Sequence, residues 1–233
     1  MNPAKRFKSS KTVLALAVTL IVFGAGSYLL GWSSLLTVKQ IEITGAPTLK
    51  SEKEISKSLN LSVGDKLARV DSRALTNRLN TVDWIETADI SRNWLNGKVA
   101  INLQPRTPVA LYTELGKPQV ALDASGAVFQ LPGQMPAGLP NVSATSIASG
   151  LIAIEVFTQL PKEFSDGIDR LTATTATNIQ INGKFNGRTL QIVWGDSEDT
   201  SLKLKVITAL LEQPENKSIR LIDVTAPHAP IVK

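Results

Sequence analysis

An uninterrupted apolar segment near the N-terminus places the strongest constraint on how this chain can fold. From Thr12 to Gly31 the sequence TVLALAVTLIVFGAGSYLLG contains no charged residue. An α-helix needs about 20 mostly apolar residues to cross the hydrocarbon core of a bilayer, and this segment just reaches that length. Tyr28 and Trp32 fall at its far end, where aromatic side chains favour the membrane interface. The sequence therefore predicts a transmembrane helix over residues 12–32.

The charges that flank this segment predict its orientation. Basic residues precede it, whereas the first charge after it is Lys39. Because positive flanks stay in the cytoplasm, we expect residues 1–11 inside the cell and the bulk of the chain outside. This topology signal consists of Lys5, Arg6, Lys8 and Lys11. Without these four, the 25 basic residues of the chain fall to 21 against 20 acidic ones, so the basic character does not indicate a nucleic-acid-binding surface.

Two other interpretations of the apolar segment stay open. A cleaved signal peptide also has a basic start and an apolar core, but its core is usually shorter and a small-residue cleavage site follows it. Here the small residues Gly24, Ala25 and Gly26 lie inside the apolar run. The third interpretation is a helix buried in a soluble protein.

The chain contains no cysteine. Disulfides, a lipoprotein anchor and a thiolate metal site are therefore excluded, and the exported part must be stabilised by burial alone. An exported domain without disulfides is ordinary in bacteria and less usual for a secreted eukaryotic domain, which favours a protein of the bacterial envelope.

The first exported region shows the order β-α-α-β-β. A strand is expected where apolar and polar residues alternate, and a helix where apolar residues recur at intervals of three and four. Asn96-Gly97 is a strong hairpin signal, and Ser51 with Glu54 forms a capping-box pattern. The expected elements are a strand over 37–44, helices over 52–60 and from Asp71, and strands over 88–92 and 98–103.

The second exported region is mostly β, with at least two helices. Asn186-Gly187 predicts a second tight hairpin, and residues 131–146 are rich in Pro, Gly and Ser and predict a loop. The expected strands lie within 120–130 and over 178–185, 189–194 and 218–224, and the expected helices over 147–160 and 202–211. Pro227 and Pro230 cannot donate ladder hydrogen bonds, so a strand continuing through them must lie at a sheet edge.

The residues do not form a recognisable catalytic or metal-binding pattern. His228 is the single histidine, and a catalytic triad or a zinc site would have to use it. Asp196, Glu198 and Asp199 precede the helix from 202, where acidic residues stabilise a helix N-terminus; a divalent cation site is the alternative. Phosphate-binding glycine motifs are absent from the sequence. Among the tryptophans, Trp84 and Trp194 are expected in the core, and Trp94 at least partly exposed.

The motifs of the exported part, taken in order, resemble one bacterial family. Those of the first region are similar to a POTRA domain: Val38-Lys-Gln-Ile-Glu-Ile-Thr-Gly45, Leu61-x-x-Gly64-x-x-Leu67 and Leu79-x-x-Val82-x-Trp84-Ile85. Those of the second are Val120-Ala-Leu-Asp123-x-x-Gly126, Leu139-Pro-Asn-Val142, Gly187-Arg188-Thr189, Val193-Trp194-Gly195, Lys203 and Ile222-Asp223-Val224. With the N-terminal anchor, the chain resembles the FtsQ/DivIB family of cell-division proteins in its actinobacterial form. Pro105 stands where the family often has Glu before an Arg-x-Pro motif.

This resemblance implies an α+β fold. A POTRA domain of order β-α-α-β-β would follow the transmembrane helix, and a mostly-β domain with an antiparallel sheet and two or more helices would come next. The implied division is a cytoplasmic tail over 1–11, the membrane helix over 12–32, the POTRA domain over 36–105, the FtsQ-type β domain over 106–225 and a C-terminal segment over 226–233.

The resemblance also implies a function without catalysis or cofactor. Such proteins are scaffolds of the divisome in the cell membrane at the septum. They bind the small coiled-coil proteins FtsB (DivIC) and FtsL, and act indirectly on FtsW and the septal transpeptidase. The partner is expected to add a strand to the sheet edge near the C-terminus. The implied partner-binding residues are Arg220, Ile222, Val224, Thr225, Ala226, His228, Ala229, Ile231 and Val232.

Three other functions fit the sequence less well. A membrane-anchored extracytoplasmic sensor or regulator is the main alternative, but it needs a cytoplasmic output domain, which an 11-residue tail does not offer. An exported enzyme would need a catalytic pattern. A translocation component of an outer membrane would need a series of alternating segments of about ten residues.

Overall fold

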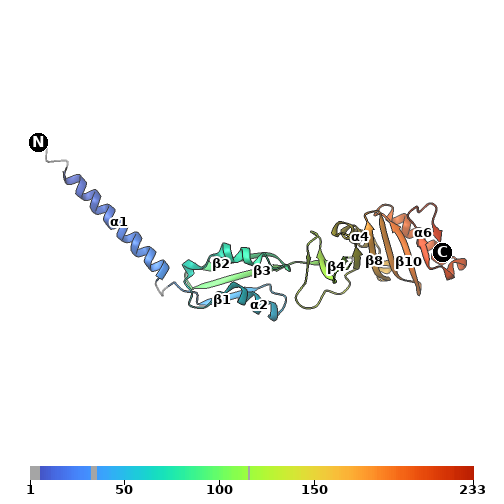
Figure 1. Ribbon diagram of the computed structural model, residues 1–233, viewed down its shortest axis with the longest axis horizontal. Helices are drawn as coiled ribbons and strands as arrows, with labels where there is room; N and C mark the ends of the chain where they lie inside the picture. Colours follow the sequence, from blue (N-terminus) through green and yellow to red (C-terminus); the bar gives the residue numbers. More distant parts are fainter. Residues whose placement is uncertain (1–5, 33–35, 115) are drawn as a thin grey trace. The chain divides into compact units, whose positions relative to one another are not determined.

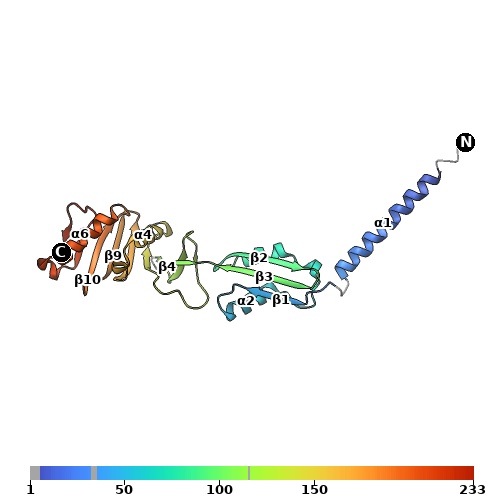
Figure 2. The ribbon, with the colours of Figure 1, turned by 180° about the vertical axis from the view of Figure 1, so that it is seen from behind.

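The computed structural model describes residues 6–32, 36–114 and 116–233. The chain forms two compact units that divide between Pro105 and Arg106. Figures 1 and 2 show the helices and strands of both units from opposite sides. Each unit has its own sheet, of three strands in the first and nine in the second.

The first helix, α1 (Arg6–Trp32), includes the apolar segment. Its described side chains run from residue 12 to residue 28, and the large apolar ones among them are at least half exposed. Within the part of the chain that the structure describes, no helix has both the length and the apolar character needed to cross a membrane, so the expected transmembrane helix over 12–32 is not identified there. Of the topology signal, Lys5 lies outside the described residues, and the others lie in the first turns of α1.

The first unit has the expected order β-α-α-β-β. Its elements are β1 (Gln40–Thr44), α2 (Leu49–Leu59), the 3-10 turn η2 (Leu67–Arg69), α3 (Ser72–Leu79), β2 (Ile85–Asn93) and β3 (Lys98–Pro105). β3 lies in the centre of the sheet, parallel to β1 and antiparallel to β2. Val99, Ile101 and Leu103 alternate along β3 and are buried, because every second side chain of a strand faces the same side.

The N-terminus of α2 differs from the expectation. Thr48, not Ser51, is the capping residue, and the helix begins three residues earlier than predicted. The Thr48 hydroxyl accepts a hydrogen bond from the Ser51 N–H, and the Ser51 hydroxyl accepts one from the Thr48 N–H, both at 3.1 Å. Ser51 thus performs the role that the sequence pattern assigned to Glu54. Asp71 caps α3 as expected, accepting from the Ala74 N–H at 3.1 Å.

The second unit contains one long sheet with helices against it. Its strands are β4 (Pro108–Glu114), β5 (Val120–Asp123), β6 (Val128–Phe129), β7 (Asn141–Ala144), β8 (Ile168–Thr175), β9 (Asn178–Phe185), β10 (Arg188–Gly195), β11 (Leu221–Asp223) and β12 (Ile231–Val232). Its helices are α4 (Ile147–Gln159), α5 (Lys162–Ser165), α6 (Thr200–Glu212) and the 3-10 turn η3 (Pro214–Ser218). The strand order is β12-β11-β10-β9-β8-β7-β4-β5-β6.

The sheet of the second unit is mixed, which corrects the expectation of an antiparallel sheet. β7 is parallel to both β4 and β8, and β11 is parallel to β10. Each parallel connection needs a crossover, and α4 and α6 provide the helical crossovers between β7 and β8 and between β10 and β11. Ile154 of α4 and Ile207 of α6 join one apolar cluster with inward side chains of the strands, such as Ile181.

Four strands of this sheet, β4, β7, β8 and β12, are not among the expected ones. β7 lies within residues 131–146, which the sequence predicts as a loop, and its four residues are too few to show a period. β8 is missing from the prediction because its register shifts between Ile168 and Arg170, which breaks the apolar alternation at that point. The tryptophan predictions are confirmed: Trp84 and Trp194 are buried, and Trp94 is 40% exposed.

Candidate partner-binding edge of the second unit

The C-terminal strands form one edge of the second sheet. β11 lies between β10 and β12, so it is paired on both sides, and β12 is the outermost strand. Within the predicted segment from Arg220 to Val232, the strand at the edge is therefore Ile231–Val232.

The predicted site residues fall into two groups. Ile222 and Val224 are fully buried in the core, so a lysine at either position would test folding rather than partner binding. The others are at the surface or only partly buried: Arg220, Thr225, Ala226, His228, Ala229, Ile231 and Val232. The structure brings Ile231 and Val232 together at the edge, whereas residues 225–229 lie in the connection between β11 and β12.

The backbone of β12 has one face toward β11 and one toward solvent. Lys233 donates to the Leu221 carbonyl at 3.0 Å and accepts from the Leu221 N–H at 2.9 Å. In an antiparallel ladder alternate residues direct both backbone groups at the partner strand, so Val232 directs its N–H and carbonyl outward. Pro230, two residues earlier, has the same orientation but no N–H to donate. The outer edge thus offers a single donor flanked by two carbonyl acceptors.

The two side chains of β12 alternate between the core and solvent. Val232 lies opposite Ile222 and packs against the core, whereas Ile231 lies opposite Asp223 and is 53% exposed. An apolar side chain this exposed on a sheet edge is available to a second chain.

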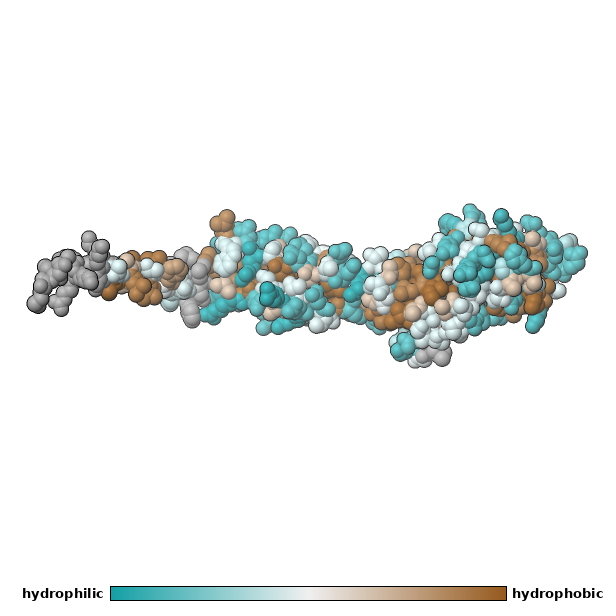
Figure 3. Space-filling view, turned by 90° about the horizontal axis from the view of Figure 1, so that it is seen from above, coloured by the Kyte–Doolittle hydropathy of each residue, from teal (hydrophilic) through white to brown (hydrophobic). Residues whose placement is uncertain are grey.

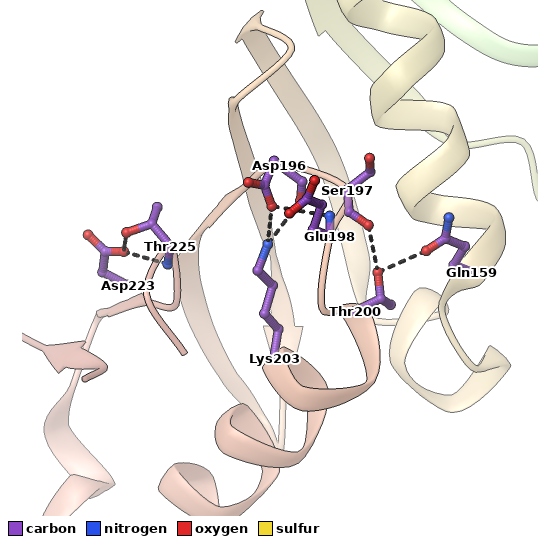
Figure 4. Close-up of polar contacts among 8 residues, drawn as sticks. All are labelled: Gln159, Asp196, Ser197, Glu198, Thr200, Lys203, Asp223 and Thr225. Atoms are coloured by element: carbon purple, nitrogen blue, oxygen red, sulfur yellow. Dashed lines mark hydrogen bonds and ion pairs between the residues drawn. The ribbon is translucent and has the colours of Figure 1, made fainter. Parts of the chain in front are cut away.

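The connection from β11 to β12 begins with a local hydrogen-bonded turn. The Asp223 carboxylate accepts from the Thr225 N–H at 3.0 Å and from its hydroxyl at 2.7 Å, as Figure 4 shows. Gly195, at the end of β10, has φ +87°, and a Cβ there would lie 3.1 Å from the Thr225 Cγ2. A glycine is therefore needed where this turn passes the end of β10.

A buried lysine supports the strands beside the edge. Lys203 in α6 is 1% exposed, and its Nζ lies 2.7 Å from Asp196 Oδ1 and 3.0 Å from the Asp196 carbonyl (Figure 4). The same ammonium group lies 5.5 Å from the centre of the Trp194 ring, whose own Nε1 is buried without a hydrogen-bond partner. The hydrogen bond from Lys203 holds the pKa of Asp196 below its usual value of 3.8.

This ion pair gives Asp196 a role different from the helix-capping or cation-binding roles that the sequence suggested for Asp196, Glu198 and Asp199. Asp196 is the counter-ion of a buried lysine, and Asp199 occupies the cap position of α6 without a side-chain cap bond. Sequence reasoning noted Lys203 only as part of a family motif. Lys203 comes seven residues after Asp196 in the sequence. The pair could be predicted only if the reversal of the chain between β10 and α6 were known.

Arg188 fixes the approach to β11 from the other side. Its guanidinium donates to the Asn216 carbonyl at 2.7 Å and to the Leu211 carbonyl at 3.0 Å. Asn216 in turn donates to the Leu210 carbonyl at 2.9 Å. The carbonyls at the end of a helix have no partners within it, so the bonds to Leu211 and Leu210 satisfy the end of α6. The bond to Asn216 of η3 positions the chain that becomes β11.

An ion pair stabilises the other end of the same unit. Arg106 lies 2.8 Å from the buried carboxylate of Asp123. Burial alone would raise the pKa of Asp123, but hydrogen bonds from the Ser125 hydroxyl, from Arg106 and from the N–H groups of Ala127 and Ser125 lower it on balance. Arg106 is the arginine of the Arg-x-Pro motif, and the structure gives it a partner in the last residue of β5.

Comparison with known proteins assigns both units. Residues 36–106 match the family model described as POTRA domain, FtsQ-type, and residues 112–225 match that of the C-terminal part of cell division protein FtsQ/DivIB. The chain belongs to the FtsQ/DivIB family. Among its FtsQ-family relatives, the chain is 29% identical to cell division protein FtsQ of Streptomyces bingchenggensis, over 97% of this chain and 88% of that protein. It is 27% identical to FtsQ of Mycobacteroides abscessus, over 95% of this chain and 69% of that protein.

These FtsQ relatives confirm the predicted family and its actinobacterial character. The FtsQ family is generally non-catalytic. The matched range of the FtsQ/DivIB C-terminal model ends at Thr225, so β11 falls within the range and β12 beyond it.

Proposed function

We propose that this chain is a non-catalytic scaffold of the divisome that links early and late division proteins and helps control septal peptidoglycan synthesis. The observation that carries the proposal is the outer edge of β12. There the Val232 N–H and the carbonyls of Pro230 and Val232 point away from β11, in the plane of the sheet. Such an edge accepts a strand from another protein through main-chain hydrogen bonds.

The β12 edge can pair with one partner strand but does not favour edge-to-edge aggregation of many copies of the chain. β12 is two residues long, and Pro230 removes a donor next to it. Short edge strands and prolines are features that limit edge-to-edge aggregation. Affinity must then come also from the exposed Ile231 side chain and from the connection over residues 225–229, where His228 is exposed. The proposed partner-binding site remains the set from Arg220 to Val232, with the buried Ile222 and Val224 supporting it.

The proposed partners are division proteins of the FtsB (DivIC) and FtsL type, which act indirectly on FtsW and the septal transpeptidase. The support for this choice is the membership of the FtsQ/DivIB family. Small coiled-coil membrane proteins can supply an extended segment beyond their helix, which is the form a strand-adding partner must have.

The chain is further proposed to be a single-pass protein of the cell membrane, concentrated at the septum, with its N-terminus inside. The support is the absence of charge from Thr12 to Gly31 and the basic residues before it. In α1, side chains such as Phe23, Leu14 and Ile21 are about two thirds exposed or more, so no other part of the described chain covers them. Figure 3 shows a hydrophobic section on the visible face of α1.

Photo-crosslinking in living cells tests the scaffold proposal. A photoreactive residue replaces Ile231 at the β12 edge, and a matched variant carries it at Val128 in β6, the strand at the opposite edge of the same sheet. Both side chains are partly exposed, at 53% and 43%. A third variant at Lys53 reports on the first unit.

We expect position 231 to crosslink to a small coiled-coil membrane protein of the division machinery, and position 128 not to. A crosslink from 128 alone would move the site to the other edge of the sheet, and one from 53 alone would move it to the first unit. If none of the three positions captures a division protein, the scaffold proposal fails.

A further inference from the structure

Two loops of the first unit expose apolar side chains. Val63, in the loop between α2 and η2, is 67% exposed. In the turn between β2 and β3, Trp94 is 40% exposed and Leu95 is 96% exposed. In the space-filling view, apolar atoms project from the surface of this unit (Figure 3). Because Leu95 is almost completely exposed at the tip of the β2–β3 hairpin, it makes no contribution to the core and is available to a second surface.

Both loops are bound to the segment by which the chain enters the first unit. The Lys39 N–H donates to the Gly97 carbonyl at 2.8 Å. The Val38 N–H donates to the Asp65 carbonyl, and the Val38 carbonyl accepts from the Gly64 N–H, both at 2.8 Å. A Cβ on Gly97 would lie 2.7 Å from the Thr37 carbonyl oxygen, so the hairpin is packed directly against the entering chain. The three exposed apolar side chains therefore surround the entry point.

The entry point lies a short way along the chain from the end of α1. α1 ends at Trp32, and Thr37 is five residues later. Whatever path is taken, five residues span at most about 18 Å. If the far end of α1 lies at the membrane surface, the loops with Val63, Trp94 and Leu95 lie within reach of the same surface.

The charges around the entry point complement an anionic surface. Segments 36–39, 62–71 and 92–98 together carry five basic residues, Lys39, Lys66, Arg69, Arg92 and Lys98, and two acidic ones, Asp65 and Asp71. Lys98 forms an ion pair with Glu42 of β1, so a net excess of two basic residues remains around the entry point. Elsewhere beyond residue 11 acidic residues outnumber basic ones, 18 to 16, because the totals there are 20 and 21. Basic residues near a membrane are attracted to anionic lipid headgroups.

Arg92 holds the ring of Trp94 in place at the tip of the β2–β3 hairpin. The Arg92 guanidinium donates to the carbonyls of Leu67 and Val70, at 3.1 and 2.7 Å, and lies 5.3 Å from the centre of the Trp94 ring. The tryptophan is thus held by a fixed cation beside an exposed leucine. Tryptophan prefers the headgroup level of a bilayer, and leucine the apolar layer below it.

We infer that the tip formed by Trp94 and Leu95, with Val63 beside it, inserts into the outer surface of the membrane that α1 is proposed to cross. This inference rests on the proposed membrane anchor. The contact fixes the first unit at the membrane surface by a second point besides the α1 connection. Its ligand is an anionic phospholipid surface.

Lipid-borne quenching of single fluorescent probes tests the inference on the full chain. The sequence has no cysteine, so one introduced cysteine carries the probe. The protein is reconstituted into phosphatidylcholine vesicles, with or without phosphatidylglycerol, that contain a nitroxide-labelled lipid. The test variant is Leu95→Cys and the matched control is Leu49→Cys, another exposed leucine of the same unit, which follows the far end of β1. Val22→Cys reports on α1.

We expect the probe at 95 to be quenched several-fold more than the probe at 49, and more strongly in the presence of phosphatidylglycerol. A probe at Val63→Cys should be quenched as well, and less so when Trp94→Ser and Leu95→Ser are added. If the probe at 22 is quenched while that at 95 matches 49, the anchor stands and the inference about the hairpin is overturned. Quenching at neither 22 nor 95 would overturn both, and quenching at 95 alone would support the hairpin contact and overturn the anchor.

Discussion

The buried pair of Lys203 and Asp196 leads to an asymmetric effect of mutation on the stability of the second unit. The two partners differ in burial: the lysine side chain is 1% exposed and the aspartate side chain is 43% exposed. Removing the aspartate leaves a positive charge inside the protein, whereas removing the lysine leaves a carboxylate that water can reach. The cost of breaking a buried pair arises mainly from the charge left behind.

The expected magnitudes follow from this difference. Asp196→Ala leaves the Lys203 ammonium with only the residue 196 carbonyl at 3.0 Å and the Trp194 ring, and should lower the free energy of unfolding by about 3 kcal/mol. Lys203→Met keeps the length of the buried stem and removes the charge. It should cost about 1 kcal/mol or less, because the carboxylate that is left behind is partly exposed and hydrated.

Native-state hydrogen exchange of the β10 amides measures this free energy for the second unit separately from the first. The decisive comparison is the double variant with Asp196→Ala and Lys203→Met. If the unpaired ammonium causes the loss, the added methionine should recover about 2 kcal/mol of it. A double variant no more stable than Asp196→Ala alone would refute the reasoning, because the loss would then come from the turn geometry at Asp196.

Three further predictions concern the same unit. Val232→Pro removes the outward donor of β12 and no internal backbone bond, so it should weaken partner binding by about 1–3 kcal/mol, or roughly 5- to 140-fold in Kd, by titration calorimetry; unchanged affinity would exclude pairing at this edge. Arg188→Ala should lower the urea midpoint by the equivalent of about 1–3 kcal/mol, because it removes the donor to the Leu211 carbonyl at the end of α6 and to the Asn216 carbonyl of η3, and a wild-type midpoint would contradict that role. The lowered pKa values of Asp123 and Asp196 stabilise the fold above about pH 4, so unfolding followed by circular dichroism should show stability falling as the pH drops below that value; stability constant down to pH 2 would be inconsistent with both.

Local patterns determined much of the first unit. Alternation along β3, the Asn96-Gly97 turn and the Asp71 cap each act over a few residues, so they are visible in the sequence before any tertiary contact is known. The same holds for the second hairpin, where Asn186 and Gly187 both have positive φ, as a tight turn of this kind needs. The order of motifs was sufficient to predict the family.

The parts that the sequence did not determine depend on contacts between distant segments. Whether β11 or a later strand forms the sheet edge depends on where the chain returns after Pro227, and the return of Ile231 to Asp223 has no local signature. The parallel pairing of β7 depends in the same way on neighbours about 30 residues away.

The sequence by itself determined the apolar segment near the N-terminus, the order of elements in the first unit and the family, because each depends on short-range periodicity or on motif order. Only the tertiary structure decided that the sheet is mixed, that Ile231–Val232 is its edge and that Asp196 is the partner of a buried Lys203. The physical reason is that strand order and charge pairing are set by which distant surfaces bury one another, and a chain records those contacts only through the whole fold.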